Sequence, residues 1–185
     1  IAEHVAGSEA AFVKLMNDRV AQMGCTNTVL INCHGLDNAA QYTTARDMVR
    51  IIDEAIRNET FKELFGTVSY TMPPTNRVEK ERDVVSGNHL IWERDLPQFI
   101  DSRVTGGVTS YTSEQTGASV VFTADHKGME TIMIVMGGER TFRKSGVPDY
   151  YGNFEEALDL LEYTYSGFHI KEILYDGQAL NQFPV

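Results

Sequence analysis

The apolar residues of this chain change their spacing at Gly66, and this change constrains the fold more than any other feature. Before Gly66 they recur every three or four residues over 12–23 and 48–56, which is the period of a helix with one buried face. After it, apolar and β-branched runs typical of strands stand at 68–71, 104–113, 118–124 and 129–136. This order predicts an α+β fold, in which helices pack on an antiparallel sheet.

Polar residues mark where the expected helices begin. Ser8 can cap the first helix, and Thr44 followed by Asp47 makes a start similar to a capping box for the second. Asn153 is the predicted cap of a last helix. The segment 61–65 predicts a short helix between them.

Turn-forming residues separate the expected strands. The residues 125–128 (Asp-His-Lys-Gly) lie between two apolar runs and predict a β-hairpin. The run 28–32 predicts a short early strand, and 168–175 predicts a last one. By contrast, 75–83 is charged and follows two prolines, so it is expected to be a solvated loop.

Length and charge exclude several classes of protein. A chain of 185 residues suits one domain, with the start of a second, and can bury a sizeable core. The net charge of −10 argues against a nucleic-acid binder, because phosphates require clustered lysine and arginine. No run of about 18 apolar residues is present, so no membrane span is expected. The chain begins with helical residues rather than a signal peptide, so an exported protein would have lost its leader, or the chain is a fragment.

The cysteines and histidines do not form a metal-binding pattern. The spacing of Cys25 and Cys33 does not match a zinc site, and the five histidines are scattered. Two interpretations stay open for the cysteines: a disulfide bond in an exported protein, or two small buried apolar side chains. No metal site and no cofactor are expected.

The stretch 32–48 places a histidine and an acid around a glycine turn, just ahead of a helix start. It reads Asn-Cys-His-Gly-Leu-Asp-Asn-Ala-Ala-Gln-Tyr-Thr-Thr-Ala-Arg-Asp-Met. It resembles the His-Gly-Leu-Asp segment of the D-alanyl-D-alanine carboxypeptidases, the low-molecular-mass penicillin-binding proteins of bacterial cell walls. The matching residues are His34, Gly35, Leu36, Asp37, Thr43, Thr44, Ala45, Asp47 and Met48. The resemblance implies the penicillin-recognising, β-lactamase-like serine hydrolase fold.

A second match lies in the strand-like run 104–112. The family carries here a Val-Asp-Gly-x-Lys-Thr-Gly-Tyr-Thr pattern, whose Lys-Thr-Gly part binds the substrate carboxylate and shapes the site. Thr109, Tyr111 and Thr112 match this pattern. Val108 stands where the family has lysine, so the positive charge that attracts a carboxylate is missing there.

Ser110 stands where the family has glycine, and its side chain restricts the backbone at a point where a ligand comes close. The resemblance implies substrate-binding roles for Thr109, Ser110, Tyr111, Thr112, His34 and Arg143, with Val108 as a degenerate position. His34 would lie near the mouth of the active-site cleft, and Arg143 is the nearest counterpart of an arginine that binds the peptide's terminal carboxylate. The structural alternatives are a turn histidine and a solvated loop, while Asp37 and Asp47 are expected to brace the backbone.

The family's nucleophile lies in a Ser-x-x-Lys segment, and no such segment occurs in the 185 residues, so no catalytic residue is assigned. Ser86-Gly87-Asn88 resembles the family's Ser-x-Asn element, but it lies at the wrong place in the chain and is interpreted as a chance match. The resemblance therefore maps residues 1–167 to the C-terminal portion of the transpeptidase-like catalytic domain. Residues 168–185 would be the last strand and the start of a β-rich C-terminal domain.

The resemblance implies a serine-type D-alanyl-D-alanine carboxypeptidase of the cell envelope, exported and membrane-associated through a C-terminal anchor. It would act on peptidoglycan stem peptides and bind β-lactams. Because of Val108 and Ser110, the alternative is a catalytically degenerate homologue that binds cell-wall peptide or acts as a scaffold. A β-lactamase relative is a third candidate, against which the His-Gly-Leu-Asp segment argues. Missing partner strands would leave apolar faces open, which predicts a second chain or a homodimer.

Overall fold

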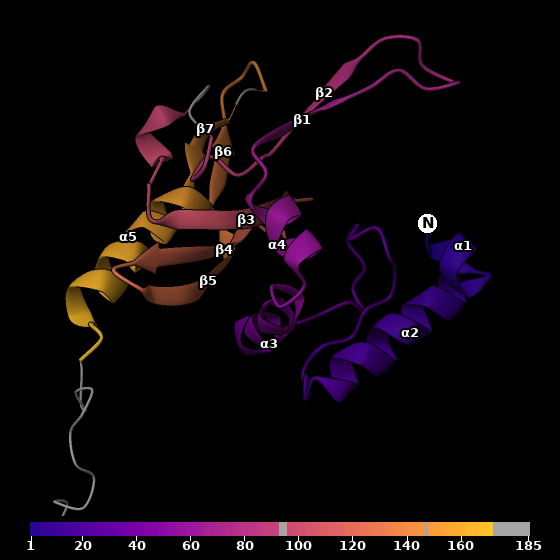
Figure 1. Cartoon of the computed structure of the whole chain (residues 1–185), viewed down its shortest axis with the longest axis horizontal. Helices are drawn as coiled ribbons and strands as arrows, with labels where there is room; N and C mark the ends of the chain where they lie inside the picture. The colour runs from indigo at the N-terminus through magenta and orange to yellow at the C-terminus, as the bar shows by residue number, and fades with distance from the viewer. Residues whose placement is uncertain (93–95, 147, 172–185) are drawn as a thin grey trace, which may run out of the picture.

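Three antiparallel strands, with helices on both faces of their sheet, organise this computed structural model (Figure 1). It describes residues 1–92, 96–146 and 148–171. The strands are β3 (Val104–Tyr111), β4 (Ala118–His126) and β5 (Met129–Gly138), and they pair in the order β3-β4-β5. Strands β3 and β5 are therefore the borders of this sheet. The prediction of helices packed on an antiparallel sheet is confirmed.

A tight turn joins β4 to β5. His126 pairs with Met129 across a two-residue loop, and both loop residues have positive φ, 55° at Lys127 and 81° at Gly128. Positive φ at both positions is the type I′ geometry, whose twist matches that of the flanking strands. Asp125 supports the turn, because its Oδ1 accepts a hydrogen bond from the Gly128 amide at 2.9 Å. The predicted hairpin is confirmed.

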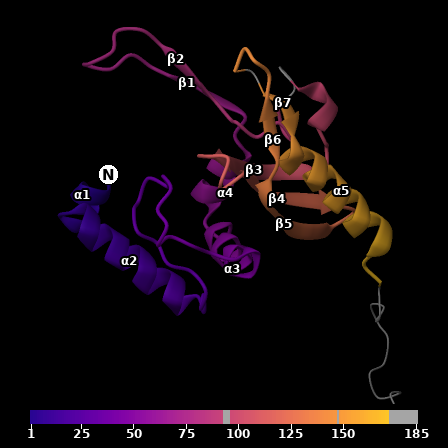
Figure 2. The ribbon, with the colours of Figure 1, turned by 180° about the vertical axis from the view of Figure 1, so that it is seen from behind.

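The sheet has a hydrophobic core on each face. Helix α5 (Gly152–Gly167) packs against β4 and β5 and covers the larger core. The buried residues of this core are Leu90, Phe99, Val104, Val120, Phe122, Ala124, Met133, Val135, Phe154, Ala157 and Leu161. On the opposite face, α3 (Ala45–Ala55) packs against β5 and α4 (Glu59–Gly66) against β3. Figure 2 shows the sheet between these two helical layers.

Helices α1 (Ala2–Ala6) and α2 (Glu9–Gln22) lie beyond α3 and α4 as seen from the sheet (Figures 1 and 2). The predicted cap of α2 is confirmed, because Ser8 Oγ accepts a hydrogen bond from the Ala11 amide at 3.1 Å. The run 28–32 is not a strand: it contributes one isolated bridge, from Val29, to the region before α3. Val29 pairs with Tyr42 alone, and a single bridge does not make a strand.

Asp47, in the first turn of α3, holds the loop that follows α2 against this helix through hydrogen bonds. Its side chain is fully buried, and its Oδ2 accepts hydrogen bonds from the Asn27 amide at 2.8 Å and from Thr28 Oγ1 at 2.9 Å. Its Oδ1 accepts a hydrogen bond from Arg50 at 2.7 Å. The predicted cap is confirmed as well, because Thr44 Oγ1 accepts a hydrogen bond from the Asp47 amide at 3.2 Å. Burial alone would raise the pKa of Asp47, but these hydrogen bonds and the charge of Arg50 outweigh burial and lower it.

A second hairpin, β1 (Ser69–Met72) and β2 (Arg82–Val85), projects away from the body (Figures 1 and 2). The strand predicted at 68–71 is confirmed within one residue. The loop predicted through 75–83 is wrong at its end, where β2 has already begun. All four residues of β2 are exposed, so the strand has no buried face that would reveal it in the sequence.

A third hairpin, β6 (Arg140–Phe142) and β7 (Pro148–Tyr151), leads directly into α5. The predicted cap of α5 is wrong, because Tyr151 holds the N-cap position and Asn153 lies buried in the first turn. A Cβ on Gly138 would stand 2.6 Å from the Asn153 backbone nitrogen. The start of α5 therefore packs directly on the end of β5, and this packing fixes the first residue of the helix.

Helix η1 (Pro97–Phe99) precedes β3, and residues 168–171 follow α5 without regular structure. The strand predicted at 168–175 is wrong over these four residues, and its remainder lies outside the described part of the chain. The predicted domain boundary falls at the end of α5 and stays a prediction.

The two cysteines are free thiols. Cys25 is buried, with its Sγ 3.6 Å from the Asp47 carbonyl oxygen, and Cys33 is exposed. The interpretation of the cysteines as small buried side chains is confirmed for Cys25 and wrong for Cys33, and the disulfide alternative is wrong in this structure. Within the described ranges, no helix is both long and apolar enough to cross a membrane.

Candidate functional site

Strand β3 places the predicted substrate-binding residues at a border of the sheet. Val108 pairs with Val121 and lies on the face covered by α3 and α4. Thr109 pairs with Val120 and lies on the α5 face. Val108 is 53% exposed and Thr109 is half-buried. A border strand of this kind can pair its backbone with an extended peptide.

The segment Ser86-Gly87-Asn88 lies against β3. A Cβ on Gly87 would stand 3.1 Å from Thr109 Oγ1, so the segment touches the strand at the predicted binding residue. Asn88 is fully buried, and its Oδ1 accepts a hydrogen bond at 3.1 Å from the backbone amide two residues on. Asn88 therefore holds a turn. The interpretation of this segment as a chance match stays a prediction, although its place beside Thr109 was not expected.

One hydrogen bond closes the His-Gly-Leu-Asp segment onto the end of β3. Thr112 Oγ1 donates to Asp37 Oδ1, although 75 residues separate the two. The hydroxyls of Ser113 and Thr112 lower the pKa of Asp37, because hydrogen bonds to a carboxylate favour its ionised form. The two segments that carry the family resemblance are therefore neighbours in space.

His34 faces α2 within this loop. Its Nδ1 accepts a hydrogen bond from the Leu36 amide at 3.2 Å, and its Nε2 lies 3.8 Å from Glu9 Oε1. Asp37 is the residue of the segment that bonds to the end of β3. The substrate-binding role of His34 stays a prediction.

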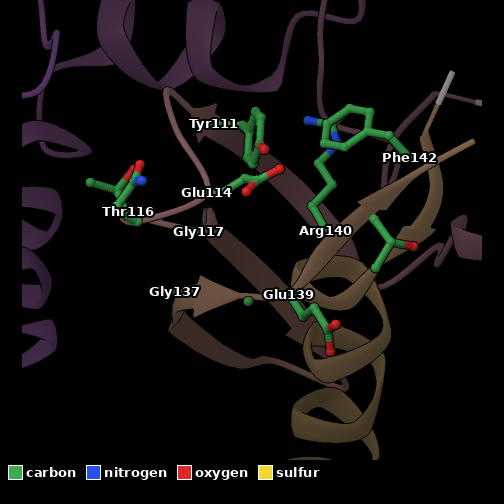
Figure 3. Close-up of a pocket in the computed structure, with 11 residues that line it drawn as sticks. Tyr111, Glu114, Thr116, Gly117, Gly137, Glu139, Arg140 and Phe142 are labelled. Carbon is green, nitrogen blue, oxygen red and sulfur yellow. The ribbon is translucent and has the colours of Figure 1, made fainter. Parts of the chain in front are cut away.

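A cavity of about 590 Å³ opens beyond Tyr111 (Figure 3). It is lined by Tyr111, by residues 114–117 of the β3–β4 connection, and by residues 137–142 of β5 and β6. Its volume falls in the range of about 300–1,000 Å³ that is typical of small-molecule sites. Tyr111 is the predicted site residue that lines it.

Arg140 supplies the positive charge of this cavity. Its guanidinium carbon lies 4.9 Å from the ring centre of Tyr111, 5.1 Å from that of Tyr151 and 5.5 Å from that of Phe142. Three rings therefore hold the charge at the wall through cation–π contacts. Arg143, the arginine chosen from the sequence, is exposed in the turn after β6 and does not line the cavity. Its role stays a prediction.

The assembled groups can bind a ligand through hydroxyls, an open strand border and one guanidinium. Acyl transfer also requires a nucleophile with an adjacent base, which the family places in Ser-x-x-Lys. In the part of the chain that the structure describes, no three His, Cys, Asp or Glu side chains gather as a metal site.

Replacing Asp37 with asparagine is expected to loosen residues 34–38. The amide is a weaker acceptor than the carboxylate, so the bond from Thr112 loses its charge assistance. We expect backbone hydrogen exchange in this segment to become about five-fold faster, with little change in global stability. Asp18→Asn, which changes an exposed acid on α2, is the matched control. Unchanged exchange at 34–38 would show that the bond to Thr112 does not hold the loop.

Comparison with known proteins identifies the family. The sequence profile of the D-alanyl-D-alanine carboxypeptidases, peptidase family S11, matches residues 1–140. This chain belongs to that family. Its curated relatives include the carboxypeptidase DacA of Haemophilus influenzae, 31% identical over 185 residues, with 98% of this chain and 41% of the relative aligned. DacA of Escherichia coli K12 is 31% identical over 192 residues, covering 100% of this chain and 40% of the relative.

Solved structures of the family share the fold. Penicillin binding protein 5 of Haemophilus influenzae matches with a TM-score of 0.68 and 30% identity, over 89% of this chain and 42% of that one. A peptidoglycan synthesis regulatory factor (PBP3) of Streptococcus pneumoniae matches with a TM-score of 0.75 over 96% of this chain and 48% of that one. Its identity is 21%, so it supports the fold alone. The predicted penicillin-recognising fold is confirmed, and the chain spans about two fifths of the length of its curated relatives.

Proposed function

We propose that the protein carrying this chain is a serine-type D-alanyl-D-alanine carboxypeptidase that acts on peptidoglycan stem peptides. The proposal is supported most strongly by one observation: Asp37 of the His-Gly-Leu-Asp segment accepts a hydrogen bond from Thr112, at the end of the border strand β3. The two segments that match the family are distant in sequence and joined in space. Family membership suggests the reaction, in which a serine is acylated and water then hydrolyses the acyl-serine ester to regenerate the serine.

Strand β3 is the part of the site that we propose contacts the peptide. An extended stem peptide can pair with the border of the sheet, while the hydroxyls of Thr109 and Thr112 offer hydrogen bonds beside it. The protein is proposed to be exported to the cell envelope, where its substrate lies. The nucleophile has to come from outside these 185 residues, which contain no Ser-x-x-Lys.

The second candidate is a catalytically degenerate homologue that binds cell-wall peptide without turnover or serves as a scaffold. The observation in its favour is Val108, an exposed valine on β3 where the family pattern has lysine. A valine cannot supply the positive field that stabilises a developing anion or a bound carboxylate. The adjacent Ser110 also narrows the approach that glycine would leave open.

Covalent labelling of the full-length protein by a fluorescent penicillin tests the proposal. We expect slow formation of an acyl adduct, and we expect Val108→Lys to accelerate it by at least about tenfold, since one preorganised charge is worth that much or more. Val84→Lys is the matched control, because both valines are 53% exposed on strands and Val84 lies on the projecting hairpin.

Two outcomes of this labelling decide between the candidates. An adduct whose rate rises in Val108→Lys and not in Val84→Lys supports the carboxypeptidase. Saturable binding of a stem peptide with no adduct in the wild type or in Val108→Lys rejects it in favour of the degenerate homologue. The predicted second chain or homodimer is a separate proposal, and light scattering that gives a monomer at high concentration would contradict it.

A further inference from the structure

The cavity beyond Tyr111 combines opposite charges in a way that binding an extended strand does not use. Arg140 faces it from β6, and two carboxylates, those of Glu114 and Glu139, line the same cavity (Figure 3). No ion pair within 4.0 Å joins Arg140 to a carboxylate among the residues whose placement the structure gives. The cavity therefore offers a cation and an anion to an incoming molecule separately.

The guanidinium of Arg140 lies among aromatic rings, and one of its nitrogens has no hydrogen-bond acceptor among the described residues. Three ring centres lie 4.9 to 5.5 Å from its guanidinium carbon, and these cation–π contacts replace part of its hydration. Its Nε is buried and meets no hydrogen-bond acceptor in the described part of the chain. A buried donor without a partner costs free energy, and a carboxylate that approaches the edge of the guanidinium would remove that cost.

Glu114 stands where it can meet the other charge of such a ligand. In Figure 3 its carboxylate lies in the same region of the cavity as Tyr111 and Arg140, whereas the side chain of Glu139 runs away from them. Glu114 and Glu139 are both exposed, so neither carboxylate takes part in a buried ion pair. The ammonium group of a ligand could bind Glu114 while a carboxylate on the same molecule binds Arg140.

The floor of the cavity lets a ligand reach the backbone. Gly117 and Gly137 both have positive φ, 67° and 73°, and their backbones touch: a Cβ on Gly117 would stand 2.7 Å from the Gly137 carbonyl carbon. Side chains are therefore excluded from this point by strain and by space. The volume of the whole cavity, about 590 Å³, is larger than a single small amino acid requires.

We propose that this cavity binds an α-amino acid group, a carboxylate and an ammonium on one carbon, carried at the end of a peptide or of a peptide side chain. The carboxylate binds Arg140, the ammonium binds Glu114, and the rest of the peptide fills the cavity over the glycine floor. This binding needs no acylation and so does not depend on the proposed function.

Four probes test the charge requirement on the 185-residue chain at neutral pH. Alanine carries both groups, N-acetylalanine only the carboxylate, and alanine methyl ester only the ammonium, while γ-glutamylalanine carries the intact group at the end of a peptide. Saturable shifts of the amide signals of Gly117, Gly137 and Gly138 in NMR titrations report binding. We expect alanine to bind at least about five-fold more tightly than either blocked form, since each charged hydrogen bond contributes that much.

The comparison of alanine with γ-glutamylalanine identifies the source of the group. Tighter binding of γ-glutamylalanine supports a peptide-borne ligand, as we propose, and tighter binding of alanine overturns that part in favour of a free amino acid. Equal affinity for alanine and N-acetylalanine would show that the cavity binds anions only, and it would contradict the proposal that the ligand's ammonium group is recognised. Absence of saturable shifts with all four probes would overturn the site itself.

Two substitutions in the cavity, each with an exposed control outside it, separate loss of binding from loss of folding. Glu114→Gln is expected to weaken the binding of alanine about five-fold and to leave the binding of N-acetylalanine unchanged. Glu156→Gln on α5 should change the affinity for neither probe. Arg140→Lys keeps a charge among the rings but loses the planar fork, and it is expected to weaken both alanine and N-acetylalanine, whereas Arg143→Gln does not. A loss of binding in Arg143→Gln with none in Arg140→Lys would place the ligand elsewhere.

Discussion

Replacing Gly107 with alanine is expected to lower the Tm of this chain by about 10 °C. A Cβ at this position would stand 2.6 Å from Asn88 Nδ2, 2.7 Å from the Val121 carbonyl oxygen and 2.8 Å from the Phe122 Cβ. The last two atoms belong to the neighbouring strand β4 and cannot rotate away. Relief would require β3 to move from β4, which breaks ladder hydrogen bonds along the border of the sheet.

Thermal unfolding followed by circular dichroism measures this change. Gly167→Ala is the control, because a Cβ there would meet nothing within 4 Å and the position ends a helix. Its Tm should change by no more than a few degrees. A Gly107→Ala protein as stable as the control would mean that β3 is not held as closely to β4 as the register indicates.

The same substitution connects stability to the site. Gly107 lies two residues before Thr109 on β3, and both face the α5 side of the sheet. Any shift that accommodates a new Cβ would also move the hydroxyl of Thr109 and the bond between Thr112 and Asp37. The small residue at 107 therefore sets the position of the strand that we propose binds peptide.

Much of the fold could be predicted from the period of the apolar residues. The helices around Ile52 and the strands of the hairpin at 125–128 bury one face each, and burial is what the spacing records. Strand β2 buries nothing and carries Arg82 and Asp83, so it gave no alternation to detect. It exists because its backbone pairs with β1.

The candidate site could be predicted only in part. The matching residues on β3 were found in sequence, but the bond from Thr112 to Asp37 spans 75 residues and no local spacing encodes it. The sequence favours Arg143 for binding the peptide carboxylate, a role that stays a prediction, whereas the arginine that lines the cavity is Arg140. Only the folded chain brings Tyr111 and Tyr151 next to Arg140, although Phe142, two residues from it in sequence, was an available signal.

Asp47→Asn is the second substitution with a large expected effect, a fall in Tm of about 8 °C at neutral pH. The side chain is 0% exposed and accepts three hydrogen bonds, two of them from residues 27 and 28. An asparagine has one acceptor oxygen and no charge, so it cannot accept from residues 27 and 28 and also from Arg50, and the charge-assisted bonds are lost. We also expect faster hydrogen exchange at residues 26–30, because this carboxylate fastens that loop to α3. Asp53→Asn, an exposed acid on the same helix, should leave both measurements unchanged.

The pH dependence of stability reports how much the negative charge of Asp47 contributes, apart from the packing of its side chain. Its pKa is lowered in the folded protein, so below about pH 4 the unfolded chain takes up a proton that the folded chain resists. This carboxylate therefore stabilises the fold fully at neutral pH, and the stabilisation is lost as the pH falls through the folded pKa. An asparagine side chain cannot titrate, so the stability of Asp47→Asn should fall less steeply between about pH 5 and pH 3 than that of the wild type. Parallel pH profiles for the two proteins would show that the buried carboxylate is not the charge that fastens α3 to the preceding loop.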